Sequence, residues 1–194
     1  SKATGDESYG EAATKIFKTI KERNALKDGL APIYVSVQSG AFTSNRVTFG
    51  ALGDSYFEYL LKTWLQGGKK ETWLREMYDK AMNGMASKLL KRSSPSNLAY
   101  VGDWDGGRIA HKMDHLVCFL PGILALGAYT QPDNPNAKRD MTLAKAMLYT
   151  CYQMYRRTAT GIAPEYVQFP GGRDPLPAAR APFYILRPET AESM

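Results

Sequence analysis

The chain has 194 residues, 44% of them hydrophobic and 23% charged, and a formal net charge of +6. These values are typical of a soluble globular protein with a substantial core. No apolar run reaches the roughly twenty residues that a membrane helix needs. The lysines and arginines are scattered along amphipathic segments and form no aromatic-interleaved basic patch, so no nucleic-acid partner is predicted.

The first half of the chain predicts helices with one short strand between them. Apolar residues recur at near-helical spacing over residues 9–20, which predicts an amphipathic helix. The β-branched and aromatic run at 33–37, with a Ser-Gly turn after it, predicts a short hairpin. Long helices are predicted over 54–65 and 73–90, and the Gly-Gly break between them predicts an antiparallel helical hairpin.

The second half repeats this alternation. A short strand is predicted at 100–102, with an Asp-Gly-Gly turn after it. A second helical pair is predicted over 115–128 and 141–157, joined by a loop rich in proline and asparagine. A third short strand at 166–169 precedes a Gly- and Pro-rich stretch. Pro188 is expected to open a last helix. Proline has no backbone N–H, and the N–H of the first helical residue has no partner within the helix.

Helical hairpins that alternate with short strands favour a mainly α fold. A solenoid or toroid of helical pairs fits this pattern better than a four-helix bundle. The strands are too short and scattered for a central sheet. Because the sequence has no strict repeat period, it does not decide whether the helical pairs close into a ring. Tyr56, Tyr59 and Leu60 lie at helical spacing and are expected in the core.

The closing run ILRPETAES, residues 185–193, places two carboxylates and a guanidinium around one proline. With Pro188 opening the helix, Glu189 and Glu192 lie one turn apart on one face, close enough to hold a water or an ion between them. The alternative is an ordinary helix start, because glutamates are favoured at the positive end of the helix dipole.

This run resembles the LRPE-T-x-ES signature of the class I α-1,2-mannosidases, glycoside hydrolase family 47. Residues 53–62 (GDSYFEYLLK) and 112–122 (KMDHLVCFLPG) resemble the D-S-Y/F-Y-E-Y-L-L-K and K-M-D-H-L-x-C-F segments of that family. Smaller pieces agree in the same order, and together they run from about Asp28 to Ser193: GLAP at 29–32, SGAF at 39–42, QGGK at 66–69 and PE at 164–165.

The resemblance implies an (α/α)7 barrel, a toroid of helical hairpins with short β-hairpins at one end, of which this chain would supply roughly three hairpins. A whole catalytic domain of the family is more than twice as long, and the chain begins with neither methionine nor a signal peptide. We therefore expect residues 1–194 to be the middle portion of a single mannosidase catalytic domain, incomplete at both ends.

The implied activity is hydrolysis of terminal α-1,2-linked mannose from high-mannose N-glycans, with inversion and with calcium. An inverting glycosidase needs one carboxylic acid and one carboxylate base. The resemblance implies that Glu189 is the general base, that Asp54 is a second essential carboxylate, and that Glu165 lines the sugar site. The acid most often assigned lies in an E-S-T-I-R segment that this chain lacks, so the fragment alone is expected to be inactive.

The resemblance also implies that His115 and Arg187 bind substrate, although a backbone-bonded histidine and a surface charge are the alternatives from the residues alone. Asp114 either lies at the sugar site or caps the helix that follows it. Calcium prefers oxygen ligands. Its direct threonine ligand in the family belongs to a T-E-A-H-P-like motif absent from this chain, so Glu189 and Glu192 are expected to act only through water.

Leu52 departs from one subgroup pattern. Endoplasmic-reticulum enzymes of the family carry arginine two residues before the aspartate of the D-S-Y segment, whereas the Golgi-type enzymes resemble this chain. A guanidinium fixes one oligomannose branch by several hydrogen bonds, and leucine leaves room for others. Asp114 and residues 119–122 look closer to the endoplasmic-reticulum type, so the subgroup stays open.

The state of the two cysteines bears on the cellular compartment of the protein. Cys118 and Cys151 are by default unrelated buried thiols, whereas the resemblance implies a disulfide and hence an oxidising lumen of the endoplasmic reticulum or Golgi. It also implies a monomeric parent, a type II membrane protein anchored outside this segment. The rival function is a mannosidase-like lectin or quality-control protein that binds oligomannose without efficient hydrolysis.

Overall fold

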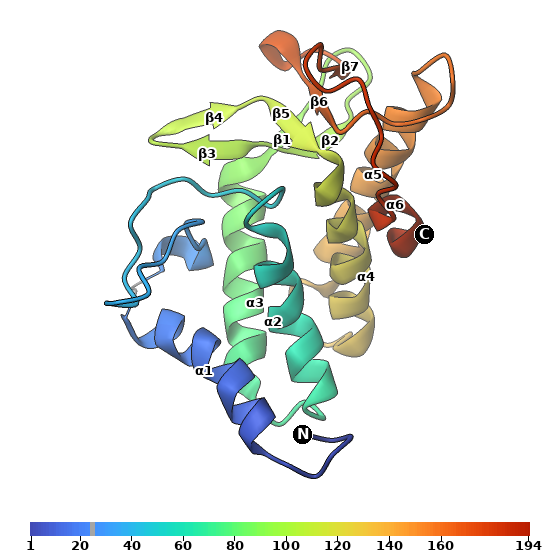
Figure 1. Cartoon of the computed structure of the whole chain (residues 1–194). Helices are drawn as coiled ribbons and strands as arrows, with labels where there is room; N and C mark the ends of the chain where they lie inside the picture. The colour runs from blue at the N-terminus through green and yellow to red at the C-terminus, as the bar shows by residue number, and fades with distance from the viewer. Residues whose placement is uncertain (24–25) are drawn as a thin grey trace.

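The computed structural model describes residues 1–23 and 26–194 and is mainly helical, with short strands gathered at one end (Figure 1). This confirms the predicted class. The α-helices are α1 (Ser8–Arg23), α2 (Asp54–Gln66), α3 (Thr72–Gly84), α4 (Leu120–Thr130), α5 (Ala137–Arg156) and α6 (Glu189–Ser193). The strands are β1 (Leu90–Arg92), β2 (Ala99–Val101), β3 (Asp103–Asp105), β4 (Arg108–Ala110), β5 (Lys112–Asp114), β6 (Tyr166–Gln168) and β7 (Leu176–Pro177).

Helices α2 and α3 form the first predicted antiparallel hairpin. On α2 the buried residues follow the i, i+3, i+4, i+7 pattern of one helix face, and they are Phe57, Leu60, Leu61 and Trp64. The helix ends where the Gly67 N–H bonds to the carbonyl of Thr63. Gly68 then adopts a positive φ of 70°, which glycine enters without steric cost. The chain reverses there and α3 runs back along α2 (Figure 1).

Helices α4 and α5 form the second pair, and a disulfide ties their elements together. Residues His115–Phe119 make a 3-10 turn just before α4. Cys118 in this turn is bonded to Cys151 of α5, with their Cα atoms 5.9 Å apart. Both side chains are fully buried in the core that the two helical pairs share. The predicted pairing of the cysteines is therefore confirmed.

Three small antiparallel sheets cover the end at which α2 and α4 begin (Figure 1). Strand β1 pairs with β2, and β3 pairs with β4. The third sheet has the order β5-β6-β7, with Met113 opposite Val167. This sheet brings Asp114, at the end of β5, beside Glu165, which precedes β6. As expected, the described part of the chain has no large central sheet.

Several predicted boundaries shift, and one predicted hairpin is reduced. The helix expected to end at residue 90 leaves α geometry after Gly84, continues as a π turn over Met85–Leu89 and gives way to β1. The helix expected from residue 115 begins as a 3-10 turn, because Pro121 cannot donate to a residue four positions earlier. The hairpin expected at 33–37 is present as one isolated antiparallel β-bridge, between Val35 and Phe42.

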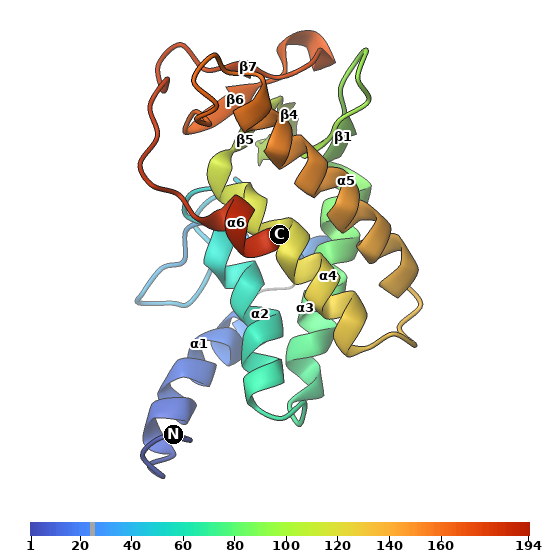
Figure 2. The ribbon, with the colours of Figure 1, turned by 90° about the vertical axis from the view of Figure 1, so that its right-hand side faces the viewer.

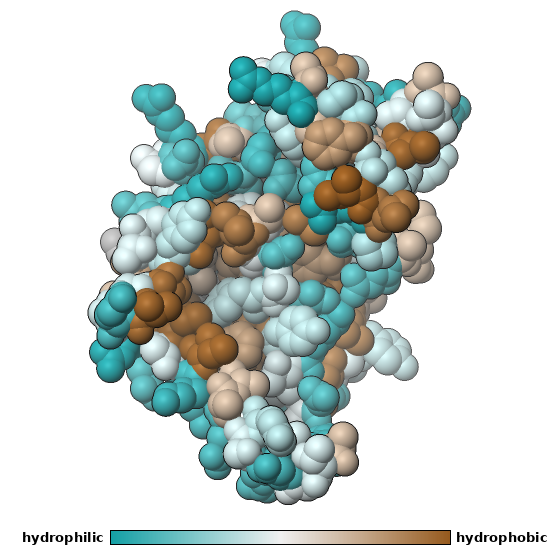
Figure 3. Space-filling model, viewed as in Figure 1, coloured by the Kyte–Doolittle hydropathy of each residue, from teal (hydrophilic) through white to brown (hydrophobic). Residues whose placement is uncertain are grey.

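The prediction that Tyr59 lies in the core is wrong. Tyr59 is 53% exposed, whereas its neighbour Leu60 is 1% exposed. Successive residues are rotated by about 100° around a helix, so Tyr59 leaves the face that Leu60 occupies. Other large apolar side chains are exposed as well, and Figure 3 shows brown patches between the polar side chains of one face. In the described residues, no helix combines the length and apolar composition needed to cross a membrane.

Candidate active site

Three of the predicted site residues lie where helical elements begin. Asp54 is the first residue of α2, His115 directly follows β5, and Glu189 is the first residue of α6. Figure 2 shows the short α6 lying across α4 and beside α2. The Lys62 amine of α2 lies 2.9 Å from the Glu192 carboxylate of α6, so these elements meet through side chains as well.

His115 and Glu189 are direct partners. The imidazole is fully buried, and its Nδ1 lies 2.9 Å from Oε2 of Glu189. On the other side of the ring, Nε2 lies 2.6 Å from the Tyr155 hydroxyl and 3.3 Å from that of Thr190. Burial lowers the pKa of His115, against the opposing effect of the Glu189 carboxylate. The imidazole is therefore neutral near pH 7, and its predicted sugar contact stays a prediction.

Glu165 and Arg187 form a bidentate ion pair. Nε of Arg187 donates to Oε2 of Glu165 over 2.7 Å, and the Arg187 NH2 group donates to Oε1. The side chains are 18% and 21% exposed respectively, so the pair has an accessible edge. The hydrogen bond to Glu165 raises the pKa of Arg187 further. Such fork-shaped pairs hold both groups in fixed orientations, so two predicted sugar-site residues form one unit.

Glu165 is also tied to His115 through the backbone. The His115 N–H donates to the carbonyl of Glu165 over 2.9 Å. The Tyr184 hydroxyl donates to the Arg187 carbonyl over 2.6 Å and so holds the segment that leads into α6. The structure therefore joins His115, Glu165, Arg187 and Glu189 into one cluster, although their segments lie far apart in the sequence.

Asp114 holds the loop that leads to Asp54. Its Oδ1 accepts from the Lys112 amine over 2.7 Å, and its Oδ2 accepts from the Ala51 N–H over 3.2 Å. It makes no cap hydrogen bond to the following turn, so the capping alternative is wrong. Gly50 lies against this carboxylate, where a Cβ atom would collide with it. A substrate contact by Asp114 stays a prediction.

Leu52 and Asp54 follow on this loop. Leu52 is 66% exposed and has a φ of 77°, a conformation that costs most residues about 1–2 kcal/mol. Gly53 approaches the Thr48 carbonyl so closely that no side chain fits there. The half-buried Asp54 then starts α2, and its N–H donates to the Gly50 carbonyl over 3.0 Å. Asp54 is thus an acidic residue in the first turn of α2, at the positive end of the helix dipole.

Sequence reasoning missed Tyr155, Thr190, Lys62 and Asp103. Lys62 bridges Glu58 and Glu192, and these hydrogen bonds raise its pKa although burial acts in the opposite direction. Asp103 is 5% exposed and accepts from the Thr48 hydroxyl over 2.6 Å. One signal was available for Tyr155: it lies four residues after Cys151, and residues spaced by four share a helix face.

Glu189 and Glu192 are the side chains expected to face a calcium ion. They are 13% and 42% exposed, and their oxygens suit a hard cation. Across residues 1–23 and 26–194, no three His, Cys, Asp or Glu side chains converge as a metal site. The two carboxylates are compatible with a role through bound water, and calcium binding stays a prediction.

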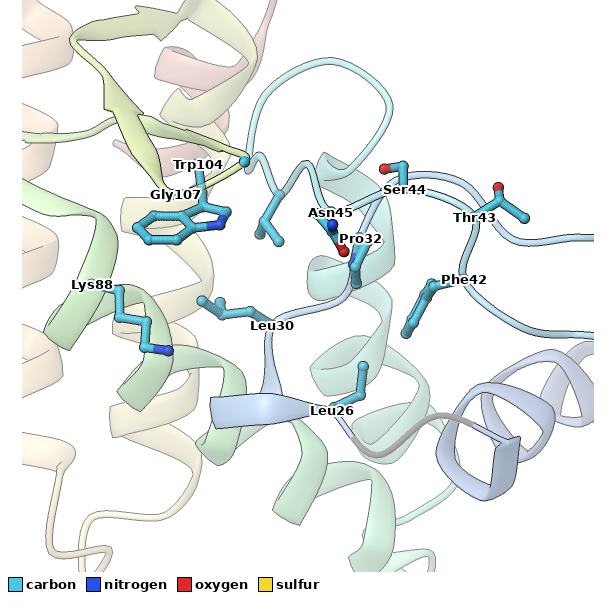
Figure 4. A pocket seen from close by; sticks show the side chains of 12 residues that line it. Leu26, Leu30, Pro32, Phe42, Thr43, Ser44, Asn45, Lys88, Trp104 and Gly107 are labelled. Atoms are coloured by element: carbon cyan, nitrogen blue, oxygen red, sulfur yellow. The ribbon is translucent and has the colours of Figure 1, made fainter.

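A cavity of about 730 Å³ lies elsewhere, between the 26–47 segment and the β3–β4 hairpin (Figure 4). Its lining is mixed, with the apolar Leu30, Phe42 and Trp104 beside polar residues such as Asn45 and Lys88. None of the predicted catalytic or sugar-site residues lines it. The candidate site is therefore defined by the clustered carboxylates and not by this cavity.

A family model, glycosyl hydrolase family 47, matches residues 1–194, which is the entire chain. The chain belongs to this family. It is 46% identical over 200 residues to the human endoplasmic reticulum mannosyl-oligosaccharide 1,2-alpha-mannosidase. It is 40% identical to a mannosyl-oligosaccharide 1,2-alpha-mannosidase of Arabidopsis thaliana and to mannosyl-oligosaccharide alpha-1,2-mannosidase IA of Drosophila melanogaster.

These matches cover nearly all of this chain but only part of each relative. This family 47 chain spans 28% of the human protein and 34% of the Arabidopsis protein. Its fold matches that of an alpha-1,2-mannosidase from Trichoderma reesei with a TM-score of 0.88 at 23% identity, over 99% of this chain and 43% of that one. The fold of these family 47 proteins is therefore shared over this segment.

Proposed function

We propose that residues 1–194 are the middle portion of one α-1,2-mannosidase catalytic domain, incomplete at both ends. The whole domain hydrolyses terminal α-1,2-linked mannose from high-mannose N-glycans with inversion. The observation that carries this proposal is the Glu189 carboxylate, bonded to a buried neutral histidine and placed beside the Arg187–Glu165 pair, in a chain of family 47. A partly exposed carboxylate fixed in this way suits a general base.

In this mechanism Glu189 takes a proton from the water that attacks the anomeric carbon. Asp54 is the second essential carboxylate, and the general acid comes from the part of the domain outside these residues. Arg187, Glu165, Asp114 and His115 belong to the mannose site. The Arg187–Glu165 pair offers charged donors and acceptors in fixed orientations, which suits the paired hydroxyls of a sugar.

Calcium is the proposed cofactor. When bound, it would polarise sugar hydroxyls and water near the scissile bond. Glu189 and Glu192 would hold calcium-bound waters, because their oxygens are hard donors and both side chains are partly exposed. Lys62 holds the Glu192 carboxylate on the side of α2 and thereby limits its orientations.

The proposed complete architecture is an (α/α)7 barrel, of which α2–α3 and α4–α5 are consecutive hairpins. Exposed apolar side chains on these helices and on the segments that flank them support this, because the rest of a barrel would cover them. They include Tyr9, Ile16, Tyr59, Tyr149, Phe183 and Ile185. Helices α2 and α4 begin at the sheet-covered end (Figure 1), which supports a site at that end of the proposed barrel.

The proposed setting is the lumen of the secretory pathway, in the Golgi or the endoplasmic reticulum. The Cys118–Cys151 disulfide supports it, since such bonds persist in oxidising compartments. The proposed partners are glycoproteins with high-mannose N-glycans, and the parent is proposed to be a monomer anchored as a type II membrane protein. The rival is a lectin-like protein that uses the same sugar-binding residues without efficient hydrolysis.

The test is digestion of a nine-mannose N-glycan by the full-length parent, with products resolved by mass over time. Mannose release with β-mannose as the first product in the NMR spectrum supports an inverting hydrolase. Chelation should stop release and added calcium should restore it. Glycan binding without release would favour the lectin-like rival. The 194-residue chain alone serves as the inactive control, because the general acid and the calcium threonine lie outside it.

The Leu52→Arg change should narrow the specificity of the parent. Leu52 is exposed on the loop before Asp54, so an arginine there would add charge-assisted hydrogen bonds to one glycan branch. Its unpaired charge would disfavour the other docking modes, for a difference of about 1–3 kcal/mol. Wild-type parent should remove several mannoses, whereas the variant should accumulate the eight-mannose product in the same assay.

A Leu52→Met variant is the matched control, because it changes the side chain without adding charge. If wild type also halts at eight mannoses, or if Leu52→Arg yields the wild-type product series at the same relative rates, Leu52 does not set branch choice. The Golgi-type assignment would then lose its main support.

A further inference from the structure

Tyr155 is a candidate site residue with no role in the function proposed above. It lies in the last turn of α5, where its hydroxyl is 2.6 Å from Nε2 of His115. The Tyr155 ring meets the imidazole edge-on, with centroids 5.5 Å apart at 78°. The Tyr184 ring packs against both of them, at 6.2 Å from Tyr155 and 5.9 Å from His115. The hydroxyl is thus held in place by two aromatic neighbours.

The donors and acceptors around His115 allow one arrangement. An ionised carboxylate only accepts hydrogen bonds, so Nδ1 must carry the proton that reaches Glu189. In a neutral imidazole Nε2 is then an acceptor and needs a donor. The Tyr155 hydroxyl is the nearer of the two hydroxyls at Nε2, at 2.6 Å against 3.3 Å for Thr190.

The protonation states of the two rings support this arrangement. Burial lowers the pKa of His115, which favours the neutral imidazole. Burial, together with the hydrogen bond to Tyr184, raises the pKa of Tyr155 to about 12, so its hydroxyl keeps its proton. With a neutral ring and a protonated phenol, the chain of donors runs from Tyr155 through His115 to Glu189.

We propose that Tyr155 is a positioning residue that donates to Nε2 of His115, fixes the orientation of the Nδ1–H ring and so orients Glu189. The imidazole N–H holds Oε2 of Glu189, and Oε1 is then the oxygen that takes the proton from water. This inference rests on the proposed role of Glu189 as base. Positioning groups behind a reacting residue typically contribute about ten- to hundred-fold in activity.

The test compares Tyr155→Phe with wild type in the full-length parent. The change removes one oxygen and keeps the ring that packs on His115. We expect kcat to fall about ten- to hundred-fold with little change in KM, because in this proposal Tyr155 acts on the base through His115. In protein labelled with 15N-histidine, the Nε2 signal of His115, assigned by its loss in His115→Asn, should shift towards that of a ring nitrogen that accepts no hydrogen bond from a phenol, while Nδ1 keeps its proton.

Tyr152→Phe is the matched control, since Tyr152 lies on the same helix, is 42% exposed and makes a ring contact with Tyr149. It should leave kcat and the His115 signals unchanged. Adding Tyr155→Phe to Glu189→Gln should lower single-turnover rates no further, because residues that act as a unit are not additive.

The outcomes separate the two proposals. If Glu189→Gln is inactive while Tyr155→Phe keeps both the wild-type kcat and the wild-type His115 signals, the role of Tyr155 is refuted and the proposed function stands. If Glu189→Gln turns over like wild type, the proposed function itself fails. An equal loss of kcat in Tyr155→Phe and Tyr152→Phe would also overturn the inference, because it would indicate a general effect on α5.

Discussion

Glu189→Gln in the full-length parent is expected to lower kcat by about 10²- to 10⁴-fold, the usual contribution of a general base. Glutamine keeps the size and the planar shape of the side chain. Its amide oxygen can still accept the hydrogen bond that His115 donates over 2.9 Å. It cannot take a proton from water, so binding of oligomannose should be retained while turnover is lost. Steady-state kinetics and calorimetric titration with glycan measure the two effects separately.

Glu76→Gln provides the matched control for this change. Glu76 is an exposed carboxylate on α3, so its replacement makes the same chemical change away from the candidate site. It should leave kcat within twofold of wild type, roughly the limit that a neutral surface change allows. Equal turnover by wild type and Glu189→Gln would remove Glu189 from the mechanism. Loss of glycan binding in the same variant would show a binding role in place of a base.

Replacement of both Cys118 and Cys151 by alanine should destabilise the domain by about 3–4 kcal/mol in the chain-entropy model. The bond closes a loop with a sequence separation of 33, which restricts the unfolded chain. Both side chains are fully buried between the turn before α4 and the middle of α5. Denaturant unfolding of the parent measures the loss, and wild type treated with reductant should approach the stability of the variant.

The variant itself is the control for the reductant, because it has lost this bond and should respond to reductant far less than wild type does. Non-reducing peptide mapping of secreted parent should recover Cys118 and Cys151 in one linked peptide pair. The disulfide would be contradicted if both cysteines were recovered as free thiols. It would also be contradicted if reductant left the unfolding free energy of the wild type unchanged. Its support for an oxidising compartment would be lost with it.

The sequence by itself determined the helical pairs and the identity of the site segments. Apolar residues on one helix face are set by local periodicity, so α2 was predicted to within one residue of its observed end, Gln66. The glycines after α2 predicted the reversal into α3. The closing LRPE run and the KMDH segment marked Glu189 and His115 without any knowledge of their surroundings.

Only the tertiary structure decided which of these side chains are partners. His115 and Glu189 are 74 positions apart, and Glu165 and Arg187 are 22 apart. Periodicity says which face of a helix is buried, but it carries no information on what lies opposite. The sequence therefore predicted only a sugar contact for His115, and the hydrogen bonds of its buried ring to Glu189 and Tyr155 came from the tertiary structure alone.

The same limit explains the errors in the fold. Tyr59 was assigned to the core from its spacing, yet the packing of α2 buries the face of Leu60 and leaves Tyr59 exposed. Asp114 has the residue type of a helix cap, but the nearby Ala51 N–H and Lys112 amine compete for its oxygens. Local preferences amount to about 1 kcal/mol per residue, and contacts between distant segments outweigh them. The sequence thus marked the segments that supply the candidate site, and tertiary packing decided which of their side chains meet at this end of the molecule.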